Sequence, residues 1–561
     1  MSTSGARLEF NEAWVDEVCA ELDQCQLPGI ALGIAVGGIP VYRKGFGLAN
    51  IELPVLLTPS TRMRIGSTTK HFAALAFMLL CEDGKAHIDD PVGQYIPELN
   101  AAWRHVTMRQ LMGHIAGIRD VYDLTFYLNG VSSPTTAADL LGMYQGLEQV
   151  NAPAGQCWDY NNGGYFLLSV AIERLANAPL EDVLKARIFD PVGMRDTLLR
   201  RSDNNFVPNS ASTHMTKLGD FVAATGASPS KAELIQGFEK LHFGADFAGA
   251  GAMVSTVDDL LTWLAHMDHP RVGTAATWEA MKTPLALLSG ATTGYGLGLI
   301  TGDYRGLSTL SHPGGWLGGN AQLIKIGCLG LDIVAISNRH DVSAALLTNR
   351  IIDRIVAGLP PGAATEQMSA TGAFCSQHTG RVVELRANGR TQIVSIDGCD
   401  WPFEWHGDGR LRPTSEWAFL NHELRLFGDP QCPDDIELVT FGDRDELSRL
   451  SNSDEDVGET ISGLYVARSL NISCRIERNG AAFELVTLGA RGSVGYGLEQ
   501  LSPAVWRAQD KESPRAAVLR FNPKSLTFQF STYHTWNLEF ERVGPDGEAC
   551  APVEAARQCP S

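Results

Sequence analysis

Arg64-Ile65-Gly66-Ser67-Thr68-Thr69-Lys70 stands directly before an apolar run from His71 to Cys81. Ser67 and Lys70 are three positions apart, so a helix that begins here carries both side chains on one face, one turn apart. A serine hydroxyl is a weak nucleophile until a base takes its proton, and a lysine amine can do this when burial keeps it neutral. The stretch therefore predicts a buried helix that opens with a nucleophile and its base.

The size and charge of the chain limit the classes of protein to consider. At 561 residues it is too long for one core, and roughly 100 to 200 residues per domain predict about three domains. A net charge of −19 argues against a nucleic-acid surface, which needs basic clustering. No apolar stretch reaches the roughly 18 residues that span a bilayer, and Glu9, Glu12 and Asp16 stand where a signal peptide has a basic start. We expect a cytoplasmic protein without a membrane or nucleic-acid partner.

Cysteine and histidine spacing indicates no metal or disulfide framework. The 11 cysteines are scattered and contain no C-x-x-C pair, which favours reduced thiols. His266 and His269 stand three apart without further partners at ligand spacing. No cofactor and no metal are implied.

Strand-like runs lie at both ends of the first 358 residues, with helical patterns between them. The runs cover residues 30–36, 41–46, 296–301, 307–311, 320–326 and 331–337. Asp341 is the expected cap of a final helix. This order predicts an α+β domain in which one antiparallel sheet is covered by helices.

Two β-rich modules follow this first domain. We place the catalytic domain at residues 1–358 and the modules at residues 371–450 and 461–546, because composition changes at Pro- and Gly-rich or acidic linkers. Both modules have short runs of alternating apolar and polar residues separated by turn residues, a pattern typical of antiparallel β-barrels or sandwiches.

The two modules look like copies of one unit. Gly372-Ala373-Phe374 is echoed by Gly463-Leu464-Tyr465, and Asn388-Gly389 by Asn479-Gly480, both at an offset of 91 positions. Two anchors at one offset predict a duplicated module of about 90 residues.

Context separates the informative short motifs from chance matches. A second S-x-x-K, Ser228 with Lys231, contains Pro229, which opposes a helix. Of two Y-x-N motifs, Tyr160-Asn161-Asn162 precedes a helical run, so its tyrosine can project from a turn into a cleft, whereas Tyr127 lies in an aromatic cluster typical of packing.

The order of three motifs carries a resemblance. Ser67-x-x-Lys70, Tyr160-x-Asn162 and His312-x-Gly314 in this order resemble the penicillin-recognising serine hydrolases, which include class C β-lactamases and DD-carboxypeptidases. Supporting segments at 106–117, 188–194 and 251–256 are similar to landmarks of this family, and the expected first domain is accordingly β-lactamase-like. Most members carry K-T-G as the third motif. His312-Pro313-Gly314 with two appended β modules resembles the D-aminopeptidase branch, which releases D-amino acids from the N-terminus of short peptides, amides and esters.

The resemblance implies a role for each residue of the first two motifs. Ser67 attacks the scissile carbonyl and forms an acyl-enzyme. Lys70 takes the hydroxyl proton, which requires a pKa well below the roughly 10.4 of a free lysine. Tyr160 acts as base or as proton shuttle to the leaving amine, and the division of labour between Lys70 and Tyr160 stays open. Asn162 orients the substrate amide.

The third motif is expected to bind substrate. His312 replaces a permanently charged lysine with a group that is mostly neutral at pH 7. A fixed cation would favour substrates with a free carboxylate, so its loss favours amides and cleavage at the N-terminus. Gly314 completes this motif, and the backbone N–H groups of Ser67 and Gly315 are the expected oxyanion hole.

A loop of the last module is a candidate for setting selectivity. In the D-aminopeptidase branch a loop of this barrel enters the active site, and the matching stretch here comprises Gly489, Ala490, Arg491, Gly492 and Ser493. The stretch contains no carboxylate for a substrate ammonium, and Arg491 would repel one. Whether substrates need a free amine therefore stays open.

Other functions are compatible with the same nucleophile. They are a broad esterase or β-lactam hydrolase, a DD-carboxypeptidase, a penicillin-binding module with little turnover, and a binding protein without catalysis. The expected partner is a small molecule or short peptide as substrate. The oligomeric state stays open, a homodimer included.

Overall fold

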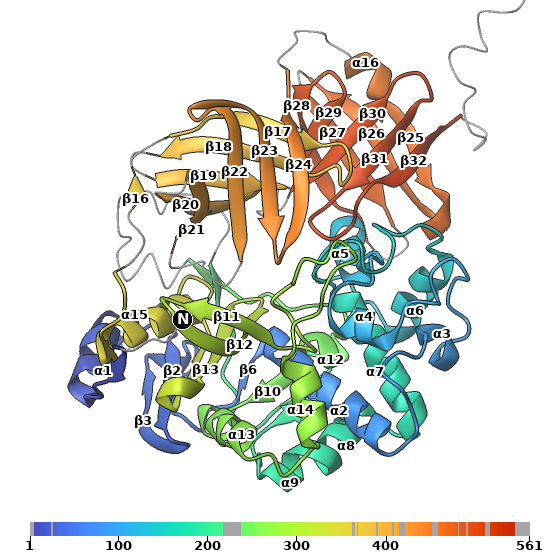
Figure 1. The fold of residues 1–561 in the computed structure, drawn as a ribbon. Helices are drawn as coiled ribbons and strands as arrows, with labels where there is room; N and C mark the ends of the chain where they lie inside the picture. Colours follow the sequence, from blue (N-terminus) through green and yellow to red (C-terminus); the bar gives the residue numbers. More distant parts are fainter. Residues whose placement is uncertain are drawn as a thin grey trace, which may run out of the picture.

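The computed structural model describes residues 5–544 except residues 24–25, 217–236, 362–364, 367–368, 389–390, 407–408, 415–420, 452–457, 481, 490–491 and 511–515. Figure 1 shows a helix-rich part with two β-barrels side by side above it. The helix-rich part extends to β15 (Val356–Ala357), and the barrels follow from β16 (Thr365–Glu366) to β32 (Leu538–Val543). The predicted fold class, an α+β domain followed by two antiparallel β-barrels, is confirmed.

One antiparallel sheet organises the first domain. Its strands, in spatial order, are β11 (Ile300–Tyr304), β12 (Leu307–Trp316), β13 (Gly319–Ile326), β14 (Leu331–Ser337), β2 (Ile30–Val36) and β3 (Ile39–Phe46). The N-terminal hairpin thus joins the C-terminal strands through the β14–β2 pairing. β11 pairs only with residues 307–311 of β12, so residues 312–316 have a strand neighbour on one side, β13.

Alternating residues of the sheet face two different cores. Ile30, Leu32 and Ile34 of β2 pack under α1 (Glu12–Cys19) and α15 (Ala344–Ile355). Ala31 and Ala35 point to the opposite face, which α13 (Val257–Asp268) covers. Successive side chains of a strand alternate between faces, so small residues lie where a helix approaches closely and large ones fill the other layer.

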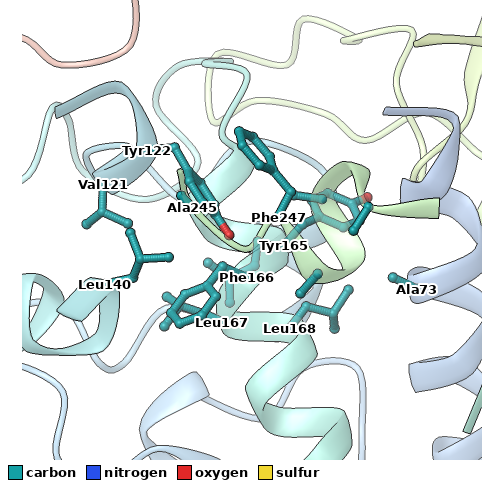
Figure 2. Packing of buried hydrophobic residues seen from close by; sticks show 14 of the residues in the cluster. Ala73, Val121, Tyr122, Leu140, Tyr165, Phe166, Leu167, Leu168, Ala245 and Phe247 are labelled. Atoms are coloured by element: carbon teal, nitrogen blue, oxygen red, sulfur yellow. The ribbon is translucent and has the colours of Figure 1, made fainter. Parts of the chain in front are cut away.

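The remaining helices form the large core beside the sheet. They are α2 (Lys70–Glu82), α3 (Val92–Tyr95), α4 (Met108–Met112), α5 (Val121–Asn129), α6 (Ala137–Gly146), α7 (Asn162–Ala176), α8 (Leu180–Leu184), α9 (Asp190–Val192), α12 (Ala248–Gly251) and α14 (Ala275–Lys282). Figure 2 shows residues 165–168 of α7 packed among Val121, Leu140 and Ala73, which belong to α5, α6 and α2. Residues 70–80 of α2 are all buried, and α2 packs most extensively against α7. The first residues of both helices are therefore held in fixed positions.

The first barrel closes through an additional pairing between β20 and β21. Its strands are β17 (Gly372–Ser376), β18 (Val382–Asn388), β19 (Thr391–Ile396), β20 (Cys399–His406), β21 (Arg410–Pro413), β22 (His422–Asp429), β23 (Cys432–Thr440) and β24 (Asp443–Arg449). The second barrel closes by pairing β25 with β32. Its other strands are β26 (Ile472–Asn479), β27 (Ala482–Leu488), β28 (Gly495–Ser502), β29 (Val505–Asp510), β30 (Ala516–Asn522) and β31 (Thr527–Ser531), after β25 (Gly463–Ala467).

The first pair of repeat anchors occupies equivalent places in the two barrels, while Gly389 of the second pair lies outside the described residues. Gly372 and Gly463 each open the first strand, with φ of 143° and 157°. A Cβ on either would lie 2.5 Å from an arginine of the last strand, Arg449 or Arg542. At both positions the backbone conformation favours glycine, and an arginine of the last strand occupies the space where a side chain would lie.

Two local predictions were wrong. The edge strand begins at Ile300, later than the predicted residue 296, because Gly296 and Gly298 pack against backbone: a Cβ there would lie 2.2 Å from the Met281 carbonyl oxygen or 2.7 Å from the His71 Cα. The last helix is capped by Ser343, whose side chain accepts from the Leu346 N–H. Asp341, the predicted cap, instead pairs with Arg339.

The described cysteines are all free thiols. Among the described helices, none combines the length and the apolar character that a bilayer crossing demands.

Candidate active site

Ser67 lies in a 3₁₀ turn, Gly66–Thr69, between β6 (Met63–Arg64) and α2. Gly66 has φ of 52°, and a Cβ there would lie 2.3 Å from the Gly315 carbonyl oxygen. Only glycine combines this conformation with so close an approach. The turn therefore presses Ser67 against the free edge of β12, where it remains half-buried.

Lys70 is fully buried at the start of α2. Its Nζ lies 3.1 Å from Ser67 Oγ, 2.8 Å from Asn162 Oδ1 and 2.7 Å from the Ala250 carbonyl oxygen. Burial holds the pKa of Lys70 well below its usual value, although the charge of Asp120 opposes the shift. A neutral amine has two N–H groups, and the two carbonyl oxygens, which can only accept, take both. Its lone pair is then left for the Ser67 hydroxyl.

Tyr160 covers this pair. Lys70 Nζ lies 4.6 Å from the centre of the Tyr160 ring, and the phenol is hydrogen-bonded to the Ser67 side chain. Burial raises the pKa of Tyr160 above its usual value, and the bond to Ser67 opposes this shift. The phenol is therefore protonated at neutral pH, which suits a proton donor better than a resting phenolate base.

Asn162 is the first residue of α7, and Asp120 holds it there. The Asn162 N–H donates to Asp120 Oδ2 at 2.6 Å, while Oδ1 of the same carboxylate accepts from the Tyr122 N–H and caps α5. With its side-chain oxygen bound to Lys70, Asn162 orients the amine. Asp120 thus links two helix N-termini at the site.

His312 is 1% exposed on β12, and both ring nitrogens have partners within the protein. Nε2 lies 2.9 Å from the Tyr295 hydroxyl, and Nδ1 lies 2.6 Å from the Pro313 carbonyl oxygen. Burial and the nearby Lys70 lower the pKa of His312 to about 3, against an opposing bond to Pro313. The imidazole is neutral at physiological pH, and it touches the cavity with its ring rather than with an unpaired N–H.

Gly314 of the third motif and Gly315, which follows it, have different surroundings. A Cβ on Gly314 would lie 1.8 Å from the Ile65 carbonyl oxygen, so this position brings the strand against the Ser67 turn. A Cβ on Gly315 would meet nothing within 4 Å, and this residue lines the cavity beside Ser67.

A cavity of about 390 Å³ opens at Ser67 and is lined by all three domains. Trp158, Tyr160 and Tyr295 form an aromatic wall from the first domain, to which Phe441 of the first barrel adds a ring 4.1 Å from Trp158. Tyr533 of the second barrel also lines the cavity, far along the chain from the nucleophile.

The second barrel reaches the site through the turn between β31 and β32. His534 lies 6.1 Å from the Tyr160 ring, centre to centre, and its Nδ1 is 3.1 Å from Asp159 Oδ1. Asn151 bonds to the His534 carbonyl and to the Trp536 N–H, and Arg119 donates to the Trp536 carbonyl. The first domain thereby holds this turn next to Tyr160.

The stretch chosen from the sequence as a selectivity loop lies elsewhere. A Cβ on Gly489 or Gly492 would lie 2.1 or 2.4 Å from Asn129, at the end of α5, and neither glycine is among the residues that line the cavity. The same holds for Ser493, while Ala490 and Arg491 fall outside the described residues. The hairpin after β27 packs on α5 because Thr487 and Tyr496 bond to carbonyls there.

Sequence reasoning missed several residues of the site. Asp120 carried a usable signal, since an aspartate directly before an apolar helical run is a typical N-cap. Tyr295, Tyr533 and His534 carried none, because their loops contain no motif whose spacing refers to Ser67.

A serine activated by a buried lysine, beside a tyrosine and a sheet edge, defines the class of the penicillin-recognising serine hydrolases. The sequence matches the Beta-lactamase family over residues 15–356, and the chain belongs to that family.

Relatives extend the similarity beyond this domain. The chain is 25% identical to the D-aminopeptidase of Brucella anthropi over 508 residues, which covers 87% of this chain and 89% of that protein. The D-aminopeptidase of Brucella melitensis biotype 1 is also 25% identical, with the same coverage.

Solved structures share the fold. The octameric penicillin-binding protein homologue from Pyrococcus abyssi has a TM-score of 0.52 at 18% identity and covers 94% of this chain and 98% of its own. The D-amino acid amidase from Ochrobactrum anthropi SV3 has a TM-score of 0.50 at 22% identity, covering 61% of this chain and 98% of its own.

Proposed function

We propose that the protein releases N-terminal D-amino acids from short peptides, amides or esters through an acyl-enzyme on Ser67. The observation that carries the proposal is the environment of Lys70, whose amine meets two carbonyl oxygens and the Ser67 hydroxyl in a fully buried position. The similarity to D-aminopeptidases over most of the chain supports the substrate class and stereochemistry.

In acylation, the Ser67 oxygen forms a bond to the substrate carbonyl carbon as its proton passes to the lone pair of Lys70. The N–H groups of Ser67 and Gly315 stabilise the developing oxyanion. When the intermediate collapses, the bond to the leaving amine breaks and the amine takes a proton from the Tyr160 hydroxyl, which Lys70 restores. Water then attacks the ester and returns the Ser67 proton by the reverse route.

The charge of the cavity supports selection of a free amine. Asp159, Asp443 and Asp445 line it, whereas Arg381 is paired with Asp397 and with Asp445. Burial raises the pKa of Asp159 to about 8 and of Asp443 to about 7, with the charge of Arg381 opposing both shifts. Burial thus favours the protonated, uncharged form of both carboxyl groups, and a substrate ammonium bound beside them would favour the ionised form and supply its missing cation.

The third motif also favours substrates that are cleaved at the N-terminus over substrates with a free C-terminal carboxylate. Since His312 is neutral and has both nitrogens engaged, this strand offers no cation to a C-terminal carboxylate. This disfavours a carboxypeptidase, whose substrates carry that carboxylate next to the scissile bond.

Paired D- and L-alanine p-nitroanilides test the proposal, with N-acetyl-D-alanine p-nitroanilide as the matched substrate without an ammonium. We expect turnover of the D anilide, little of the other two, and an acyl adduct on Ser67 by intact mass. Ser67→Ala should lose the adduct and on the order of 10³-fold or more in kcat.

Other results would assign the alternatives. Preference for a short-chain ester or a cephalosporin over the D anilide identifies a broad esterase or β-lactam hydrolase. An acylation burst without a steady state identifies a penicillin-binding module. Equal rates with D and L anilides contradict the stereochemical part of the proposal.

A further inference from the structure

Four hydrogen bonds connect the Tyr160–Asn162 segment to the edge strand through the protein interior. The Asn161 N–H donates to His114 Nδ1 at 3.0 Å, and His114 Nε2 lies 3.2 Å from the Tyr295 hydroxyl. That hydroxyl lies 2.9 Å from His312 Nε2, and His312 Nδ1 is 2.6 Å from the Pro313 carbonyl oxygen. The three side chains between the two ends, His114, Tyr295 and His312, are at most 1% exposed.

The partners at the two ends determine every proton in this chain. A backbone N–H only donates, so His114 Nδ1 accepts and its neutral ring carries the proton on Nε2. A carbonyl oxygen only accepts, so His312 carries its proton on Nδ1 and Nε2 accepts. Burial lowers the pKa of both histidines, which excludes a second ring proton at neutral pH. The Tyr295 hydroxyl then accepts from His114, and its own proton can go to the Nε2 lone pair of His312 at 2.9 Å or to the Tyr165 hydroxyl, of which we assign it to His312 because Nε2 has no other donor.

We infer that Tyr295 is a positioning residue for hydrolysis at Ser67: by accepting from His114 and donating to His312 it fixes the Nδ1–H tautomer of His312 and ties the Tyr160 segment to the Gly315 strand. The inference rests on the proposed reaction at Ser67 but not on its D-amino acid specificity. Tyr295 acts through its neighbours, since the partners of its hydroxyl are side chains of the protein, His114, His312 and Tyr165.

Local geometry agrees with this role. His114 adopts φ of 60°, a conformation that costs a non-glycine residue energy and persists where surrounding contacts over-determine it. In this conformation its ring lies 4.3 Å from the Tyr160 ring and 4.8 Å from the Tyr295 ring, centre to centre. The same ring therefore contacts the proposed proton donor and the relay.

Tyr295→Phe tests the inference because it removes one hydroxyl and keeps the ring. The matched control is Tyr144→Phe, which also removes a fully buried hydroxyl, here bonded to the Arg119 carbonyl oxygen at 3.2 Å and to neither histidine of the chain of hydrogen bonds. We expect Tyr295→Phe to lower kcat by on the order of ten- to a hundred-fold with little change in KM, since small displacements of catalytic groups cost this much. Tyr144→Phe should keep the wild-type kcat.

The tautomer is read without any substrate, by NMR of ¹⁵N-histidine-labelled full-length protein, with His312→Asn identifying the resonances. Wild type should show a protonated Nδ1 and an unprotonated Nε2 at neutral pH, and Tyr295→Phe should change this pattern. An Nε2–H tautomer in the wild type, or a folded Tyr295→Phe variant with unchanged kcat and ring resonances, overturns the inference. If the wild type does not hydrolyse the D anilide, kcat is measured with the ester that it does hydrolyse. Failure of the proposed D-aminopeptidase activity is then distinguished from failure of the inference about Tyr295.

Discussion

The amine of Lys70 shows how a side chain becomes a base through its surroundings. Three positions from Ser67 in the chain, it could equally be a charged donor to that hydroxyl. Burial disfavours the ammonium, and the carbonyl oxygens of Ala250 and Asn162 accept hydrogen bonds from the two N–H groups of the neutral amine. The only direction left for the lone pair is toward Ser67.

The pH profile follows from this environment. In the proposed reaction Lys70 works as a base in its neutral form, which exists above its pKa in the folded protein, and that pKa is lowered from the usual value near 10.5. The rate should therefore rise with pH and reach its plateau well below pH 10. His312, with a pKa of about 3, should add no ionisation between pH 5 and 9.

Measurement of kcat from pH 5 to 10 with an uncharged p-nitrophenyl ester checks this prediction, because such a substrate does not itself titrate. His312→Asn supplies the control, since its pH profile should have the same shape as the wild-type profile. A plateau reached only near pH 10.5 would contradict the neutral amine.

At the scale of elements, the site depends on the contact between the Ser67 turn and the edge of β12. Gly66 and Gly314 make the contact from opposite sides, and each leaves less than 2.5 Å between a hypothetical Cβ and a backbone oxygen. A strand and a turn can approach this closely only without side chains between them. The spacing of Ser67 and Gly315 is thus set by Gly66 and Gly314, which have no side chain to take part in the reaction.

Gly314→Ala should separate the strand from the turn. The added methyl group would have to displace the Ile65 carbonyl oxygen from 1.8 Å, so we expect a loss of about 1–3 kcal/mol in the free energy of unfolding and a fall in kcat of about a hundred-fold. Denaturant unfolding and steady-state kinetics measure the two effects.

Gly327→Ala is the matched control, because a Cβ there meets nothing within 4 Å. It should leave both quantities near their wild-type values. If Gly314→Ala does the same, the close contact is not what positions the sheet edge.

At the scale of the whole molecule, three domains build one cavity. The two barrels contribute Phe441, Tyr533 and His534 to walls that the first domain leaves open. Arg381 of the first barrel donates to the Tyr533 carbonyl oxygen of the second, and Arg119 of the first domain donates to the next turn residues. We therefore expect the docking of the barrels, more than the fold around Ser67, to limit the size of the substrate.

His534→Ala should enlarge the cavity beside Tyr160. We expect the ratio of kcat/KM for D-phenylalanine over D-alanine p-nitroanilide to rise about tenfold, the scale on which pocket contacts discriminate side chains. His378→Ala provides the control, because this exposed histidine of the first barrel does not line the cavity.

The sequence suggested residues 489–493 as the selectivity loop instead. Deletion of residues 490–494 should change the ratio of kcat/KM for D-phenylalanine over D-alanine p-nitroanilide less than His534→Ala does. The reverse order would assign selectivity to that loop instead of the turn between β31 and β32.

Much of the fold could be predicted from local patterns. The hairpin of β2 and β3, the buried helix after Ser67 and the duplicated barrels each have a periodicity or a repeat that needs no distant contact. The start of β11 could not be predicted, since Gly296 and Gly298 are held in a loop by the backbone of Met281 and His71.

By itself, the sequence predicted Ser67 as the nucleophile and Lys70 as its base and set the order of the motifs, because the two residues are one helical turn apart and any helix brings them together. Only the tertiary structure decided that His312 is buried with both ring nitrogens bonded inside the protein, that Tyr295 joins the site, and that Tyr533 and His534 line the cavity. Burial and hydrogen bonding between distant segments control these properties, and neither has a signature in local spacing. The stretch around Ser67 carries the residues of the proposed reaction, while residues far along the chain line the cavity beside it.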